Sequence, residues 1–199
     1  MPSPMIPRER VHAWSESIGR EPTEHQAALQ RLLKSQRRIS RFVEENAENL
    51  NMATGGVAMY MIGVILRLFD LSGGQLRSAT WAQVRAAEAR VQAAVPEVLP
   101  LDDGLPERAR AIAWRAQPHI LDEALMALFE RQAKEGEEDL DKVEAFKVYM
   151  LMWVATEALA ENWKSPKGFE GDDTYTYVHI EPNDDDEAPA DDGDADAAE

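Results

Sequence analysis

Two histidines stand with carboxylates at spacings that could support acid–base or metal chemistry. His119 is followed by Asp122 and Glu123, and positions four apart share one face of a helix. Glu123 could therefore orient His119 as a base, or the two could hold a metal weakly. The pattern is equally typical of a histidine in a first helical turn with a local carboxylate partner. We favour this second interpretation.

The second histidine, His12, follows Glu9 at the spacing used by di-iron carboxylate bundles. Those sites need the motif twice and two further inward glutamates, and the chain has one copy. It has no cysteine and no nucleophile-elbow, P-loop, kinase or zinc-protease pattern. We therefore predict no catalytic residue, no metal and no cofactor, and expect that the chain is not an enzyme.

Charge is distributed very unevenly along the sequence. The stretch from Glu170 to Glu199 contains 13 acidic residues and no lysine or arginine, whereas the first 169 residues hold 24 acidic and 21 basic residues. A nearly neutral body thus carries an anionic tail. Blocks of like charge stay solvated and often serve as interaction segments.

The same tail contains apolar and aromatic side chains that could anchor a partner by strand addition or pocket insertion. Acidic residues beside them would accelerate the encounter with a basic surface. The leading hypothesis is a non-enzymatic adaptor, assembly chaperone or inhibitor that binds a basic protein, although the tail could also be only a solubilising extension. The predicted partner-binding residues are Phe169, Tyr175, Tyr177, Val178, Ile180, Asp184, Asp185 and Asp186.

Five cations within 11 residues form the one concentrated basic stripe: Arg31, Lys34, Arg37, Arg38 and Arg41. We interpret the stripe as a solvated helix face that pairs with acids on neighbouring helices. A phosphate-contacting surface is disfavoured because the net charge of −16 repels polyanions. A third hypothesis is that the acidic tail folds over the stripe.

Helical periodicity runs through most of the chain, so the predicted fold is an all-α bundle of about six helices in one domain. Residues 1–7 form a proline-containing flexible start, residues 8–164 the bundle, and residues 165–199 a disordered acidic tail with a strand-like segment at 174–180. The predicted helices span about 8–18, 22–50, 52–69 (ended by Ser72, Gly73 and Gly74), 78–94, 105–134 and 138–163. Pro118 either kinks the helix over 105–134 or divides it into 105–116 and 118–134.

Two stretches without charge, 52–66 and 148–156, are expected to pack against each other at the centre of the bundle. The first extends about 22 Å as a helix, short of the roughly 30 Å hydrocarbon layer, and Arg67 follows it. Membrane insertion through 52–69 is the disfavoured alternative.

A further alternative from a different class is a structural subunit of a homo-oligomeric assembly of the phage or secretion type. The start of the chain has no apolar core of a secretory signal. We expect a cytoplasmic protein.

Overall fold

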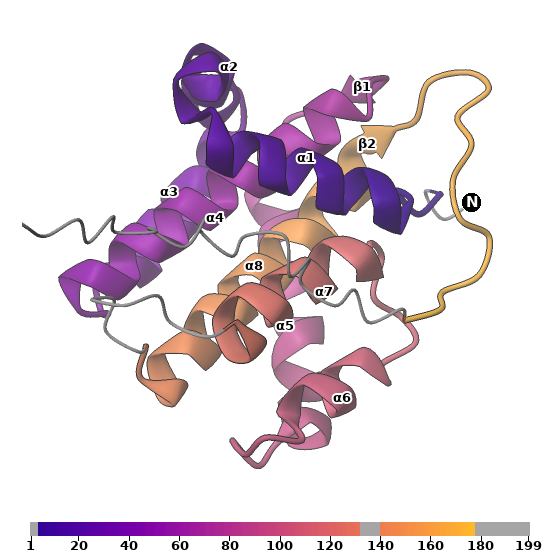
Figure 1. Ribbon diagram of the computed structural model, residues 1–199. Coiled ribbons are helices and arrows are strands. Elements are labelled where there is room, and N and C mark those ends of the chain that lie inside the picture. The colour runs from indigo at the N-terminus through magenta and orange to yellow at the C-terminus, as the bar shows by residue number, and fades with distance from the viewer. Residues whose placement is uncertain (1–3, 132–139, 178–199) are drawn as a thin grey trace, which may run out of the picture.

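The computed structural model describes residues 4–131 and 140–177. Within them the chain is mostly helical, which agrees with the predicted all-α class (Figure 1). The helices are α1 (Arg8–Arg20), α2 (Pro22–Ser35), α3 (Arg37–Ala47), α4 (Met52–Leu71), α5 (Trp81–Val98), α6 (Leu105–Arg110), α7 (Pro118–Leu125), the π-helical turn η1 (Met126–Glu130) and α8 (Lys142–Asn162). Two short strands, β1 (Gln75–Leu76) and β2 (Trp163–Lys164), complete the described elements.

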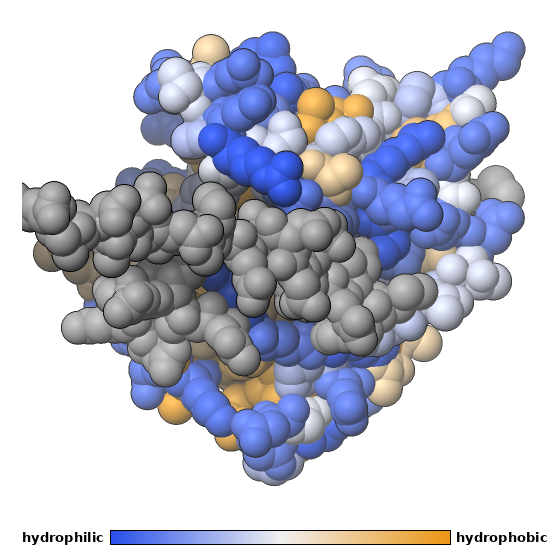
Figure 2. Space-filling view, in the orientation of Figure 1, coloured by the Kyte–Doolittle hydropathy of each residue, from blue (hydrophilic) through white to orange (hydrophobic). Residues whose placement is uncertain are grey.

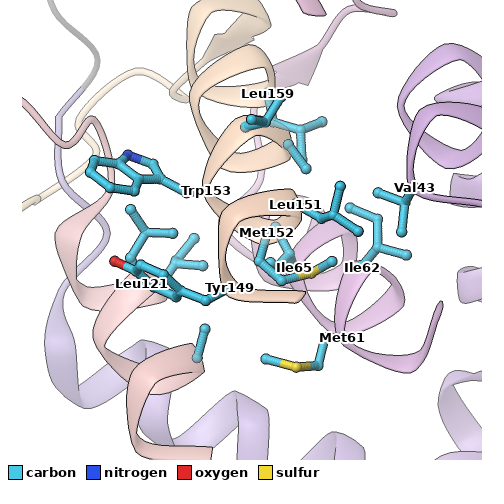
Figure 3. Close-up of a cluster of buried hydrophobic side chains, with 14 of the residues drawn as sticks. Val43, Met61, Ile62, Ile65, Leu121, Tyr149, Leu151, Met152, Trp153 and Leu159 are labelled. Carbon is cyan, nitrogen blue, oxygen red and sulfur yellow. The ribbon is translucent and has the colours of Figure 1, made fainter. Parts of the chain in front are cut away.

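The two apolar stretches form the central helices, as predicted. α8 packs against α4 and α5 and also contacts α3 and α7. Figure 3 shows α8 between two groups of side chains, with Tyr149 and Trp153 toward α7 and Met152 toward Ile62 and Ile65 of α4. Tyr149, Trp153 and Met152 are all fully buried. Because α8 buries residues on every side, it has no polar face and cannot be an outer helix.

By length and composition, α4 is the one helix among the described residues that could cross a membrane, and half of its most apolar stretch is buried within the protein. Its first turn is fixed by polar contacts. Asn51 caps the helix by accepting from Thr54 N at 2.9 Å, and Glu144 of α8 accepts hydrogen bonds from Asn51 and Thr54. These contacts join the N-terminal ends of the two central helices.

The predicted continuous helix over 22–50 is wrong, because α2 ends at Ser35 and α3 begins at Arg37. The residue between them, Gln36, is 1 % exposed and its side chain bonds to the chain at Arg77 and Ala79. A buried polar side chain must keep its partners. The helix axis therefore bends at Gln36, where the side chain reaches the backbone of Arg77 and Ala79.

Two further helix ends differ from the prediction. Pro96 lies inside α5, which continues to Val98 and closes with a bond from Leu99 N to Val95 O, so the proline does not stop the helix. α6 ends at Arg110 instead of reaching residue 116. There the guanidinium of Arg115 donates to Arg110 O at 3.0 Å and to Ile112 O at 3.3 Å, which satisfies free carbonyls at the end of α6.

Residues 165–177 of the predicted tail, which we call the C-terminal strap, lie against the bundle, and residues 178–199 lie outside the described residues. β2 pairs with β1 in antiparallel register, and the strap then runs past the start of α1 toward α7 (Figure 1). Its backbone bridges to the chain start, where Asp172 N donates to Met5 O at 3.1 Å. Residues 174–177 of the predicted strand form no strand, and 178–180 lie outside the described residues.

The turn before β1 fixes the origin of the strap and gives a testable prediction. Gly73 and Gly74 both have positive φ, but only at Gly74 would a Cβ atom lie 2.2 Å from Lys164 O. Gly73→Ala should lower the free energy of unfolding by about 1 kcal/mol through backbone strain. Gly74→Ala should cost a further 1–3 kcal/mol, roughly, because the strands must separate. Urea denaturation of both variants measures the difference, and equal losses would contradict this account.

Candidate functional site

The structure gathers the candidate chemistry of the sequence at one place, where the strap crosses α7. Pro118 occupies the first turn of α7, a position where its missing N–H costs no hydrogen bond. The helix then presents His119, Asp122 and Glu123 to three different neighbours. The three residues do not converge on one point, as a metal or a base with its orienting partner would require.

Asp122 is the centre of this contact and has no solvent exposure. Its Oδ1 accepts from Arg115 Nη1 at 2.8 Å, and its Oδ2 accepts from the hydroxyl of Tyr175 at 2.8 Å. A buried carboxylate keeps its charge only when donors surround it. Arg115 comes from the loop after α6 and Tyr175 from the strap, so the site joins three separate parts of the chain.

Arg110, at the end of α6, forms the second part of the contact. Its guanidinium donates two hydrogen bonds of 2.7 Å to the carboxylate of Glu130, the planar two-point geometry that suits arginine. Glu130 closes η1, whose wider turn ends at this position. The ring of Tyr177 lies over the guanidinium, 3.8 Å from its central carbon, which is a cation–π contact.

The start of the chain supplies the third part. Arg8 donates to Glu123 Oε2 at 2.9 Å, and His12 lies 3.3 Å from Glu123 Oε1. Glu9, the other half of the di-iron-like motif, is exposed and does not join the cluster. No group of three or more potential metal ligands occurs within residues 4–131 and 140–177.

His119 lies beneath the strap and is 2 % exposed. Its Nε2 is 2.9 Å from Asp172 Oδ2, and Nδ1 has no hydrogen-bond partner among the described residues. Burial lowers the pKa of His119, although Asp172 and Asp122 act in the opposite direction. Burial also raises the pKa of Tyr175 to about 12, with the contact to Asp122 adding to the effect. Near neutral pH the site therefore holds a neutral imidazole and a protonated phenol.

The predicted partner-binding aromatics that the structure describes all contact the chain's own bundle. Phe169 packs edge-on against Trp163 at 5.2 Å, and Tyr175 and Tyr177 bind at the cluster described above. All three side chains are partly exposed in these positions, and their predicted role in binding a partner stays a prediction. Val178, Ile180, Asp184, Asp185 and Asp186 lie outside the described residues.

The basic stripe is divided by the bend at Gln36. Arg31 pairs with Asp70 of α4 at 3.2 Å, and Arg41 pairs with Glu45 of its own helix at 2.6 Å. Arg38 reaches Ala79 O at 3.4 Å. Lys34 and Arg37 are exposed and form no ion pair with a described residue. Within the part of the chain that the structure describes, the expected pairing with an acid on a neighbouring helix is therefore found only for Arg31.

Neither of two grooves on the described surface is lined by His119, Asp122 or Glu123. One follows the outer side of α2 and α3. The other lies between α3, α5 and α8 and is more apolar, with Phe42, Phe146 and Met150 in its wall. In Figure 2, the part of the visible face that is not grey is largely hydrophilic, with small separate hydrophobic groups.

Sequence reasoning missed the cations that hold the strap, Arg8, Arg110 and Arg115. All three are at most 8 % exposed although arginine is usually solvated. One available signal was the proximity of Arg115 to Pro118, because a charged side chain beside a helix break can cap the preceding helix.

No protein-family model, curated protein or solved structure matches this chain. Its function must be argued from the geometry of the strap contact and from the distribution of charge.

The hydroxyl of Tyr175 provides a test of the strap contact. Tyr175→Phe keeps the ring and removes the donor to a fully buried carboxylate, so the free energy of unfolding should fall by about 1 kcal/mol. Thr176→Val at the exposed neighbouring position is the matched control and should have little effect. Chemical denaturation compares the three proteins. A Tyr175→Phe variant as stable as the wild type would show that the bond does not hold the strap.

The buried imidazole gives a pH prediction. The folded pKa of His119 is below its ordinary value of 6.5, so the unfolded chain binds more protons than the folded chain below about pH 6.5. The stability that His119 contributes is complete above that pH and is lost as the pH falls through the folded pKa. Burial raises the pKa of Glu157, which works in the opposite direction, so the titration is followed at His119 itself by NMR. A midpoint at or above 6.5 would contradict the burial described here.

Proposed function

We propose that this chain is a non-enzymatic protein-binding module whose acidic C-terminal residues, 178–199, engage a basic protein surface. The observation that carries the proposal is the attachment of the strap at its last described residue. Tyr177 lies on Arg110, and the sequence that follows has ten acidic residues and no lysine or arginine. The anionic segment therefore starts from a defined point on a rigid helical body.

The electrostatic state of the bundle supports this division of roles. Arg8, Arg110 and Arg115, the cations at the strap contact, are each paired with a carboxylate of the bundle. Because these carboxylates balance their positive charge, the three arginines attract the acidic tail only weakly. Excess negative charge of this kind favours fast, salt-sensitive association with a basic partner and repels acidic ones.

The proposal changes the expected mode of binding. Because Phe169, Tyr175 and Tyr177 contact the bundle, they hold the base of the tail and do not insert into a partner. Recognition would then come from the charge of residues 178–199, with Val178 and Ile180 as the apolar positions that remain for a partner. Binding of this type is modest in affinity and reversible.

The test compares three proteins: the full chain, a chain ending at Tyr177, and a full-length variant with Asp184, Asp185 and Asp186 changed to asparagine. The probe is a fluorescent oligolysine peptide, followed by fluorescence anisotropy. Truncation should weaken binding about tenfold or more at low salt, and the difference should shrink at about 500 mM NaCl, where charges are screened. The affinity of the asparagine variant for the peptide should lie between those of the full chain and the truncated chain.

A second measurement addresses natural partners. The full chain should retain a basic protein from a lysate of its own cells that the chain ending at Tyr177 does not retain. If the full and the truncated chain bind the peptide equally and retain the same proteins, the tail is only a solubilising extension and the proposal fails.

A further inference from the structure

The outer face of α3 has an unusual order of charges. Lys34, Arg37 and Arg41 line the groove at one end, and Glu44, Glu45 and Glu48 line it at the other, with Leu33 and Met59 in its floor. The spacing of three or four residues places all six charges on one side of the α2–α3 segment. The opposite side of α3 is buried through Ile39, Phe42, Val43 and Ala47. Among residues 4–131 and 140–177, the groove is therefore the uncovered face of this helix.

This order conflicts with the helix's own dipole. Negative side chains are favoured at the N-terminal end of a helix and positive ones at the C-terminal end. In α3 the first turn has no acid, the last turn has no base, and Glu44, Glu45 and Glu48 crowd the end where the backbone carbonyls are free. Only Arg41 and Glu45 pair with each other among the six, and the remaining four form no ion pair with a described residue. The arrangement is not explained by the stability of α3 alone.

A uniform polyelectrolyte does not fit the groove. An acidic segment, such as this chain's own residues 178–199, would meet the three glutamates, and a basic one would meet Lys34, Arg37 and Arg41. The complementary partner is a helix whose charges run in the reverse order. A second α3 lying antiparallel supplies that order.

We propose that two copies of this chain form a homodimer through antiparallel contact of their α3 helices. The symmetry of the sequence fits a two-fold axis at the level of Phe42 and Val43. Arg37 lies as far before that point as Glu48 lies after it, and Arg41 as far before it as Glu44 lies after it. Arg37 and Arg41 then each face a carboxylate of the other copy, as a self-complementary interface requires. The two helix dipoles are also antiparallel.

Apolar side chains beside the charges extend the face. α4 lies next to α3 as the second arm of a hairpin (Figure 1). Met59 lies in the groove floor, and Met52, 94 % exposed, lies two turns earlier on the same side of α4. The flexible side chain of methionine can adapt its shape to an opposing surface. The contact therefore combines an apolar floor with charged edges.

Sedimentation velocity of the full chain is the first test. At about 50 mM NaCl a monomer–dimer equilibrium should appear below about 100 µM, and about 500 mM NaCl should shift it toward monomer. A monomer at every concentration at low salt would overturn the proposal.

Charge reversal tests the predicted pairing. Arg37→Glu with Arg41→Glu, and separately Glu44→Arg with Glu48→Arg, should each weaken dimerisation at least about tenfold. An equimolar mixture of the two variants should recover a dimer, although both remain anionic overall because the starting net charge is −16. Circular dichroism establishes that each variant is folded. Folded variants that dimerise like the wild type, or that fail to recover on mixing, would exclude this interface.

Two controls distinguish the α3 contact from a general effect of net charge and from a contact made by the tail. Arg85→Glu with Lys167→Glu makes the same change in net charge as Arg37→Glu with Arg41→Glu. Both control positions are exposed and outside the lining of the groove, so this variant should dimerise like the wild type. The full-length chain with Asp184, Asp185 and Asp186 changed to asparagine should also dimerise. Loss of the dimer in that variant would mean that the tail makes the contact, and this would overturn the α3 interface. The proposed binding of a basic partner by the tail is decided separately, by the oligolysine experiment.

A cross-linking experiment avoids large changes of charge. The chain has no cysteine, so Glu45→Cys introduces a single reactive thiol close to the proposed axis. A short bismaleimide should join two such chains, whereas Glu107→Cys on the exposed side of α6 should give no dimer under the same conditions. Equal cross-linking of both variants would indicate random collision and would count against the interface.

Discussion

The buried carboxylate of Asp122 is the constraint on which the C-terminal half of the structure depends. A charge with no solvent exposure must be met by donors, and its donors are Arg115 and the hydroxyl of Tyr175. A buried ion pair adds little net stability to the fold. Removing one of its two partners is nevertheless strongly destabilising, because the other charge is then buried without a partner. The requirement specifies where the loop after α6 and the strap must lie on α7.

Several local irregularities follow from the same requirement. α6 stops early because Arg115 turns back onto its last carbonyls, and η1 ends in Glu130, which pairs with Arg110. Arg110 in turn supports Tyr177, so the strap is held at both tyrosines. The polar cluster thereby places residues 165–177, the first part of the predicted tail, within the folded domain. Ten of the 13 acidic residues between Glu170 and Glu199 come after it.

The second electrostatic feature, on α3, has the opposite character. The charges at the strap are buried and paired within one chain, whereas those on α3 are exposed and only partly paired. If α3 joins two chains, each dimer presents two acidic segments. Two linked binding segments raise the effective affinity for a partner with several basic sites without any new contact. The two proposals remain separate, since one concerns residues 178–199 and the other the helix face.

The sequence by itself determined the helical class, the central position of the stretches at 52–66 and 148–156, and the separation of a near-neutral body from an acidic end. Those properties depend on local periodicity and composition, which adjacent residues carry. Only the tertiary structure decided that Gln36 breaks a helix, that Arg8, Arg110 and Arg115 are buried, and that Tyr175 and Tyr177 bind their own bundle. Each of these depends on the pairing of a buried polar group. For Gln36, Arg8 and Tyr175 the partner lies more than 40 residues away, and such pairings leave no periodic trace in a single sequence.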